Sequence, residues 1–150
     1  MSEPVFKSLE PNVMVDDVNE TVDFYKNNLG FTLTVGVDEK MQTVDTTVDS
    51  HRLVWAMLTR GDASLMIQNR DSLAKEVPEF KEMRPGGAFT LYFSILHINA
   101  LYNEVKDKVE VYTEPHKTLY GADEFVIRDN NGYFLFFAEQ HARADDSRLG

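Results

Sequence analysis

The clearest pattern along the chain is an apolar stripe at helical spacing that occurs twice. The first copy has apolar side chains at positions i, i+4, i+7 and i+11, and consists of Val18, Val22, Tyr25 and Leu29. The second copy follows eighty positions later and consists of Ile98, Tyr102, Val105 and Val109. Because this spacing places the apolar residues on one face, each copy predicts an amphipathic helix. Asn19 is matched by Asn99, and the repeat indicates a duplicated module.

Short apolar segments around the first helix predict the strands of the first module. These segments are 13–15, 31–35, 52–59 and 63–68, with a tight turn at 60–62. The polar, threonine-rich stretch 38–50 predicts an extended loop or a frayed hairpin. We expect Asn19 to cap the helix and Gly30 to end it, because these residue types favour helix ends. The predicted order is β-α-β-β-β.

The second half of the chain repeats this order. Its predicted strands are 89–95, 109–112, 124–128 and 133–138, with the helix at 98–108 and an Asn-Gly hairpin turn at 129–132. Segment 114–121 is expected to be a loop, because Pro115 argues against a continuing strand. We therefore predict an α+β protein with modules at about 8–69 and 87–139. A connecting helix at about 71–81, capped by Asp71 or Ser72, and a mobile tail at about 140–150 complete the prediction.

Composition narrows the classes of partner. The chain has 150 residues, a formal net charge of −10 and 43% hydrophobic residues, which suits a packed core. The negative charge disfavours nucleic acid and anionic membranes as partners and favours a neutral or cationic small molecule. The absence of cysteine excludes disulfides and thiolate chemistry. With no leader segment and no apolar run of membrane-spanning length, we expect a cytoplasmic protein.

Two motifs resemble a known family. The segment from Pro11 to Tyr25, with Leu29-Gly30-Phe31, is similar to the opening of the glyoxalase, bleomycin-resistance and extradiol dioxygenase superfamily, whose members are also called vicinal oxygen chelate proteins. Tyr120-Gly121 and the segment 124–133 resemble its closing hairpin. The resemblance spans about 9–139. It implies two βαβββ modules whose curved sheets enclose a pocket, commonly in a homodimer, and it leaves the function open because one scaffold serves many activities.

The resemblance also implies where a metal ion would bind. Metal-dependent members use side chains at equivalent strand positions of the two modules, which correspond here to Glu10, Met66, Thr90 and Phe136. Of these, Glu10 alone is a competent ligand, and a shift of two residues near Met66 would add Gln68. Two donors are too few for a catalytic divalent ion. We therefore predict no metal and no other cofactor, as in the metal-free, bleomycin-resistance-like branch.

Strand alternation predicts an apolar pocket in place of the metal. Met14, Met57, Ser64 and Phe134 share its predicted face. The predicted ligand-binding residues are Glu10, Asn12, Trp55, Met66, Gln68, Thr90, Tyr92, His116, Tyr120 and Phe136. Aromatic and thioether walls with a few polar groups are typical of small-molecule sites. As alternatives, Met66, Phe134 and Phe136 fill a core, and Glu10 lies in solvent at a strand start.

Histidines offer little support for an enzyme. His51, His97, His116 and His141 are spread over a loop, a helix entry, a second loop and the tail, without metal-ligand spacing. His116 and Tyr120 belong to the loop before the closing hairpin, which is expected to fold over the pocket; otherwise His116 is an ordinary surface histidine.

These observations favour a metal-free protein that binds a small hydrophobic, aromatic or antibiotic-like molecule, planar or cationic in character. The alternative is a metal-dependent lyase, isomerase or dioxygenase with Glu10, Gln68 and His116 as donors. A third possibility is a subunit that serves mainly in dimer formation or protein interaction.

Overall fold

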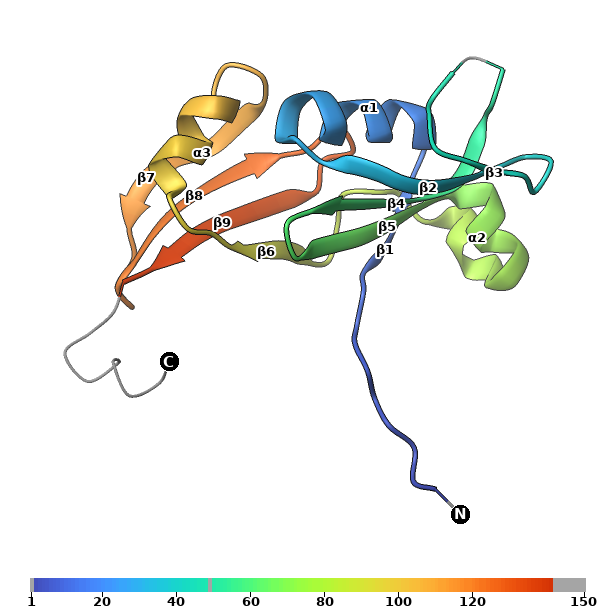
Figure 1. Cartoon of the computed structure of the whole chain (residues 1–150), viewed down its shortest axis with the longest axis horizontal. Coiled ribbons are helices and arrows are strands. Elements are labelled where there is room, and N and C mark those ends of the chain that lie inside the picture. The colour runs from blue at the N-terminus through green and yellow to red at the C-terminus, as the bar shows by residue number, and fades with distance from the viewer. Residues whose placement is uncertain (1, 49, 142–150) are drawn as a thin grey trace. The chain divides into compact units, whose positions relative to one another are not determined.

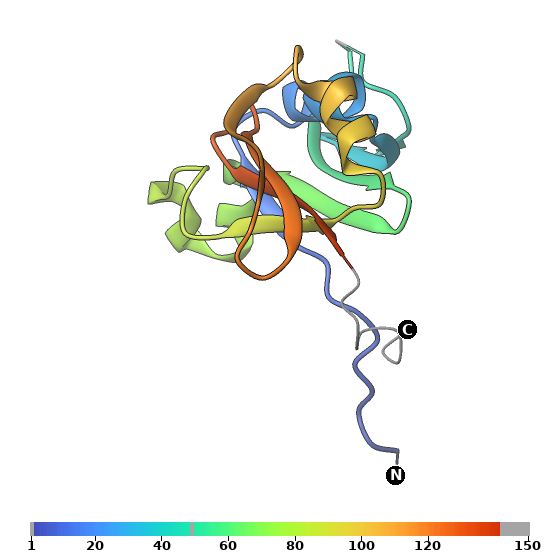
Figure 2. The ribbon, with the colours of Figure 1, turned by 90° about the vertical axis from the view of Figure 1, so that its left-hand side faces the viewer.

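The computed structural model describes residues 2–48 and 50–141. The chain divides into two compact units, Met1–Met83 and Arg84–Gly150, and each is described by itself. The elements of the first unit are β1 (Asn12–Val15), α1 (Val18–Leu29), β2 (Thr32–Asp38), β3 (Thr43–Val44), β4 (Leu53–Arg60), β5 (Ala63–Asn69), α2 (Arg70–Glu76) and the 3-10 helix η1 (Pro78–Glu82). They form a sheet in the order β1-β5-β4-β2-β3, in which β1 is parallel to β5 and the other pairs are antiparallel. Residues 2–10 are exposed and extend away from this sheet (Figure 1 and Figure 2).

The first predicted helical stripe is confirmed as the buried face of α1. Val18, Val22, Tyr25 and Leu29 are each at most 2% exposed. The helix lies along the sheet (Figure 1), whose buried residues on β4 and β5 alternate as Ala56, Leu58, Leu65 and Ile67. The Tyr25 ring meets Phe31 edge to face at 5.5 Å between ring centroids. The apolar face of the helix, set by its period of 3.6 residues, therefore packs against the apolar face of the sheet, set by the alternation along the strands, and the two form one core.

The cap of α1 differs from the prediction. Asp17, not Asn19, is the N-cap: its backbone is extended, and its carboxylate accepts a hydrogen bond from the Glu20 N–H at 3.0 Å. Asn19 is buried instead, and its side-chain amide accepts a hydrogen bond from the Leu53 N–H and donates one to the His51 carbonyl. The other end was predicted correctly, because Gly30 closes the helix with a φ of 71°, which a residue without Cβ adopts readily.

The connecting helix and its cap also differ from the prediction. The α-helix ends at Glu76 and a 3-10 helix follows, so that 71–81 is not one α-helix. Asn69 is the N-cap of α2, and its side chain accepts from the Ser72 N–H at 2.8 Å. Asp71 and Ser72 lie within the helix, because the helix is capped two to three residues earlier than expected, at the end of β5.

The second unit repeats the topology of the first. Its elements are β6 (Thr90–Ser94), α3 (Ile98–Val105), β7 (Glu110–Lys117), β8 (Ala122–Arg128) and β9 (Phe134–Gln140). The sheet order is β6-β9-β8-β7, with β6 parallel to β9 and the remaining pairs antiparallel. The predicted α+β class is thus confirmed, and so is the βαβββ order, to which the first module adds the short strand β3 between β2 and β4.

The segment around Pro115 is a strand and not the predicted loop. Pro115 lies within β7, where three steps from Thr113 to His116 face two steps from Val126 to Glu124 on β8. This irregularity is a bulge, and β7 is the edge strand of its sheet. Proline lacks an N–H to donate to a ladder, so edge strands and bulges are the positions that tolerate it.

The second helix is shorter than predicted. It ends at Val105 and not at 108, and a turn follows, so Val109 lies beyond the helix and is half-buried. Ile98 and Val105 are buried as expected, whereas Tyr102 is half-buried. At the end of the chain, Gln140 belongs to β9, and residues 142–150 of the predicted tail lie outside the described residues.

Candidate functional site

The face of the first sheet opposite its buried residues carries a band of half-buried side chains. Met57 is opposite Met66, and Trp55 is opposite Gln68, on neighbouring strands β4 and β5. Asn12 on β1 pairs in register with Met66. The strand alternation read from the sequence therefore places Asn12, Trp55, Met66 and Gln68 on one face. Trp55, Met66 and Gln68 are half-buried, whereas side chains of a closed core are fully buried.

Two amide side chains make this face polar at one edge. The Asn12 Nδ2 donates to the Gln68 Oε1 at 2.9 Å, and the Gln68 Nε2 donates to the Ser72 Oγ at 2.8 Å. This row of hydrogen bonds orients Gln68 beside the thioether and indole groups. An aromatic or alkyl group that reaches the face meets an apolar wall, with amides available to a polar substituent.

The second sheet carries a phenol–carboxylate cluster, which we define as Tyr92, His116, Tyr120, Glu124 and Gln140. The Tyr120 hydroxyl donates to the Glu124 Oε2 at 2.6 Å, a short distance typical of a bond to a charged acceptor. Gln140 Nε2 donates to the Tyr92 hydroxyl at 3.2 Å. The His116 Nε2 lies 3.7 Å from the Glu124 Oε1. Glu124 is 6% exposed, so a carboxylate is held almost out of solvent among phenols.

Strand geometry brings this cluster together. Tyr92 on β6 pairs in register with Phe136 on β9, and Glu124 on β8 pairs with His116 on β7. Tyr120 lies in the turn between β7 and β8, and its hydroxyl contacts Glu124, which follows it by four residues on β8. Three predicted ligand-binding residues, Tyr92, His116 and Tyr120, are thus brought together.

The remaining predicted residues of the second sheet are placed differently. Phe136 is half-buried between Tyr92 and Val126 in the sheet register. Thr90 is exposed and pairs with Phe134. Thr90 and Phe136 are two residues apart in register and take no part in the hydrogen bonds of the phenol–carboxylate cluster that are described above.

Sequence reasoning missed Glu124. It stands in the run Ala122–Arg128, where Asp123 and Glu124 together resemble a solvated strand start. A usable signal was the alternation itself, since Glu124 shares the parity of Val126, a buried strand residue. A carboxylate at such a position needs hydrogen-bond partners, which Tyr120 provides.

The cluster raises the pKa of Tyr120 from its ordinary value of 10.0 to about 12. The main cause is the hydrogen bond to Glu124, which holds the phenol proton; burial and the Tyr92 hydroxyl add to it. At neutral pH Tyr120 is therefore a hydrogen-bond donor and not a base.

We expect Tyr120 to lose its proton at an unusually high pH. Since the folded-state pKa lies above the unfolded value, the stabilisation from this group is complete below pH 10.0 and is lost as the pH rises toward about 12. Absorbance titration of the phenolate should show this late step, and Tyr120→Phe should remove it. Tyr112→Phe, at a side chain that is 62% exposed, is the matched control and should leave the step in place. A late step that survives Tyr120→Phe would contradict the assignment.

The positions that the resemblance assigns to a metal ion do not fit one here. Glu10 is exposed before β1, and its carboxylate accepts from the Ser8 hydroxyl at 2.9 Å. Met66, Thr90 and Phe136 supply a thioether, a hydroxyl and a phenyl ring, which are poor donors for a divalent ion. Within residues 2–48 and 50–141, no three His, Cys, Asp or Glu side chains are grouped so that they could hold a metal ion.

The other histidines serve different contacts. His51 is half-buried, and its Nδ1 lies 3.2 Å from Asp38 Oδ2. The backbone N–H of Gln42, the His51 ring and the Lys40 N–H hold the pKa of Asp38 below its usual value. His97 enters α3, and His141 pairs with Asp123. In the part of the chain that the structure describes, no helix is long and apolar enough to cross a membrane.

Comparison with known proteins identifies relatives and solved structures that are similar to this chain. A curated relative, the Bacillus subtilis (strain 168) protein named "Uncharacterized protein YraH", is 25% identical over an alignment of 114 residues that covers 73% of this chain and 79% of that protein. A crystal structure of a protein of unknown function from Agrobacterium tumefaciens str. C58 has a TM-score of 0.69 at 18% identity, over 93% of this chain and 98% of that one.

A third similar structure is the bleomycin-binding protein of Streptomyces verticillus in complex with copper(II)-bleomycin. Its TM-score is 0.61 at 20% identity, over 93% of this chain and 100% of that one. At these identities the structural likeness shows the fold. The sequence model of one family matches residues 8–137, nearly the whole chain. The chain belongs to the Glyoxalase/Bleomycin resistance protein/Dioxygenase superfamily.

Proposed function

We propose that this protein binds a small, planar, cationic aromatic molecule without a metal ion, at the phenol–carboxylate cluster of its second sheet. The observation that carries the proposal is Glu124, a carboxylate 6% exposed and hydrogen-bonded to Tyr120. The rings of Tyr92 and Tyr120 are 48% and 46% exposed beside it. A surface of this kind combines a negative charge with open aromatic faces.

The physical match is to a flat cation. A delocalised cation is attracted by the negative faces of the phenol rings and by the Glu124 carboxylate. In a site that is partly removed from water, this attraction is stronger than at an open surface. The formal net charge of −10 adds a long-range field that draws cations toward the protein.

The family supports binding of a small molecule. The Streptomyces verticillus neighbour carries bleomycin-binding in its name, and its structure contains copper(II)-bleomycin. The face of the first sheet, with Trp55, Met57 and Met66 beside the Asn12–Gln68 pair, offers a second apolar surface of suitable chemistry. In keeping with the family resemblance, we further propose a cytoplasmic homodimer; light scattering would give its mass.

The proposal is tested by thermal shift and calorimetric titration with proflavine, a planar aromatic cation. Proflavine should raise the melting temperature, because a ligand selective for the folded state stabilises it. Glu124→Gln should weaken binding about tenfold or more, since it removes a largely buried charge partner. Glu110→Gln removes the same charge from the exposed start of β7 and is the matched control.

Three results would contradict the proposal. The first is equal binding by the Glu124→Gln and Glu110→Gln variants. The second is equally tight binding of the planar anion fluorescein. The third is a tightly held stoichiometric metal, measured by mass spectrometry on protein purified without chelator, whose removal abolishes binding. That third result would favour a metal-dependent lyase, isomerase or dioxygenase.

A further inference from the structure

A pocket of about 310 Å³ opens in the second unit between α3 and the paired ends of β7 and β8. It is lined by Ile98, Asn99, Tyr102, Lys117, Asp123 and Phe125, among others. Its volume lies in the range of small-molecule sites. Tyr102 and Phe125 line it from the side of the sheet on which α3 packs, and the phenol–carboxylate cluster reaches it at Glu124 and His116.

The pocket follows from the unequal copies of the repeated helix. In α1 the stripe position Val22 is 0% exposed, whereas its counterpart in α3, Tyr102, is half-buried and borders the pocket. The helix α3 has 8 residues against the 12 of α1, so it covers less of its sheet. The bulge at Pro115 lies along the same margin.

The floor of the pocket is apolar and aromatic. Ile98 is 4% exposed, and the Tyr102 ring packs edge to face on the buried Phe125 at 5.1 Å between ring centroids. Since Phe125 supports Tyr102 from behind, the ring is held in place rather than free to fill the space. A flat hydrophobic group would bury apolar surface against Tyr102 and Ile98.

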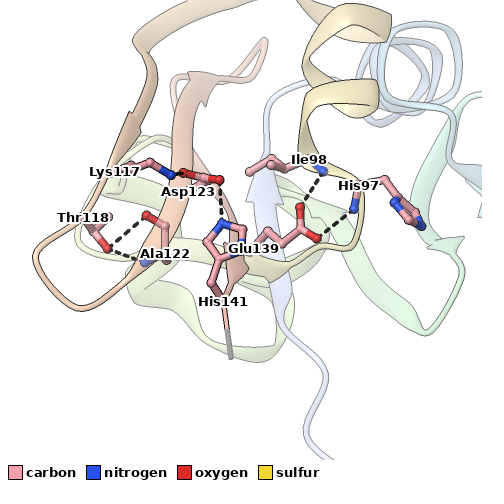
Figure 3. A network of polar contacts seen from close by, with 8 residues as sticks. All are labelled: His97, Ile98, Lys117, Thr118, Ala122, Asp123, Glu139 and His141. Carbon is pink, nitrogen blue, oxygen red and sulfur yellow. Dashed lines mark hydrogen bonds and ion pairs between the residues drawn. The ribbon is translucent and has the colours of Figure 1, made fainter. Parts of the chain in front are cut away.

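The rim carries charges of both signs. The Lys117 Nζ lies 2.9 Å from the Asp123 Oδ1, and the His141 Nε2 lies 2.6 Å from the Asp123 Oδ2 (Figure 3). These contacts, led by Lys117, hold the pKa of Asp123 below its usual value, so it is charged at neutral pH. The Lys117 side chain is 81% exposed, which leaves its ammonium accessible to a ligand.

The N-terminal end of α3 already binds a carboxylate of the protein itself, so it is not the anchor for an anionic group of a ligand. Glu139 on β9 accepts hydrogen bonds from the N–H groups of His97 and Ile98 at 3.2 and 3.1 Å (Figure 3). An anionic group bound in this pocket can pair instead with the exposed ammonium of Lys117. A cationic group can pair with Asp123. A ligand that carries only one charge therefore pairs with Asp123 or with Lys117, but not with both.

We propose that this pocket binds a small zwitterion with an aromatic ring, of the class of free aromatic α-amino acids. The ring lies on Tyr102 and Ile98, the ligand carboxylate pairs with Lys117 and with the Asn99 amide, and the ligand ammonium pairs with Asp123. Such a ligand offers an opposite charge to each partner of the Lys117–Asp123 ion pair and has no net charge, so the negative field of the protein does not oppose it.

Calorimetric titration with L-phenylalanine, phenethylamine and 3-phenylpropionate tests the proposal. The zwitterion should bind most tightly, and each analogue should be weaker by about two- to fivefold, the loss of one partly exposed ion pair. Lys117→Ala should weaken phenylalanine binding by a similar factor and should not weaken phenethylamine binding, because it removes a positive charge beside Asp123. Lys108→Ala, which removes an exposed charge just after α3, is the matched control and should leave all three affinities unchanged.

Three outcomes would overturn the inference. The first is no heat with any of the three compounds at millimolar concentration. The second is phenylalanine binding that Lys117→Ala and Lys108→Ala affect equally. The third is binding that Tyr120→Phe abolishes and Lys117→Ala spares, which would place the ligand on the phenol–carboxylate cluster. Because the proflavine experiment depends on Glu124 and this one on Lys117, either proposal can fail while the other stands.

Discussion

Phe125→Ala is expected to lower the free energy of unfolding of the second unit by about 3–5 kcal/mol, the usual cost of removing a fully buried aromatic ring. Phe125 is 0% exposed, stacks on Phe137 at 5.1 Å and supports the Tyr102 ring from behind. The substitution therefore removes contacts to the sheet and to α3 together, and it leaves a cavity that the small residual side chain cannot fill.

Urea denaturation followed by circular dichroism measures this change. Leu119→Ala is the control, because Leu119 is fully exposed in the turn before β8, and its truncation should change the free energy of unfolding by less than about 0.5 kcal/mol. Equal midpoints for the two variants would show that Phe125 does not hold α3 on the sheet. A loss confined to a partial transition would show that the two units unfold separately.

The repeated helical stripe could be read from the sequence because it follows from a local rule. Side chains at i, i+4 and i+7 share a face whatever surrounds them, and Val22 and Tyr25 are buried accordingly. The turn before the last strand was equally local: Gly132 takes a φ of 88° there, and its N–H donates to the Asp129 carbonyl at 3.1 Å.

The errors arose where a distant segment decides the outcome. Pro115 argued for a loop, but whether a proline interrupts a sheet depends on whether its strand lies at the edge, which only the order β6-β9-β8-β7 reveals. The length of α3 was overestimated because the stripe position Val109 remains apolar beyond the end of the helix. In both cases the local pattern was sound and the tertiary context prevailed.

Three of the five residues of the phenol–carboxylate cluster, Tyr92, His116 and Tyr120, were among those singled out from the sequence. Tyr92 followed from strand alternation, and Tyr120 from its place before the closing hairpin. Glu124 was missed because its carboxylate is buried with a hydrogen bond from the Tyr120 hydroxyl, which lies in the turn between β7 and β8. A pair four residues apart around a turn has no fixed period, so alternation alone does not find it.

The sequence predicted that Asn19 caps a helix, whereas its observed hydrogen bonds predict a second large effect, on stability. It is 7% exposed; its Oδ1 accepts from the Leu53 N–H at 2.8 Å, and its Nδ2 donates to the His51 carbonyl at 2.9 Å. Since Asp17 already caps α1, the amide is free to hold the start of β4 against the helix.

Asn19→Ala should therefore lower the free energy of unfolding by about 1–3 kcal/mol, because it leaves the buried Leu53 N–H without its partner. The repeat itself supplies the matched control. Asn99 occupies the equivalent position of α3 but is exposed, so Asn99→Ala should change stability by less than about 0.5 kcal/mol. Urea denaturation of both variants measures the difference. Equal losses would mean that the asparagine serves helix α1 locally, as a cap would, whereas a loss confined to Asn19 shows that it joins two elements far apart in the sequence.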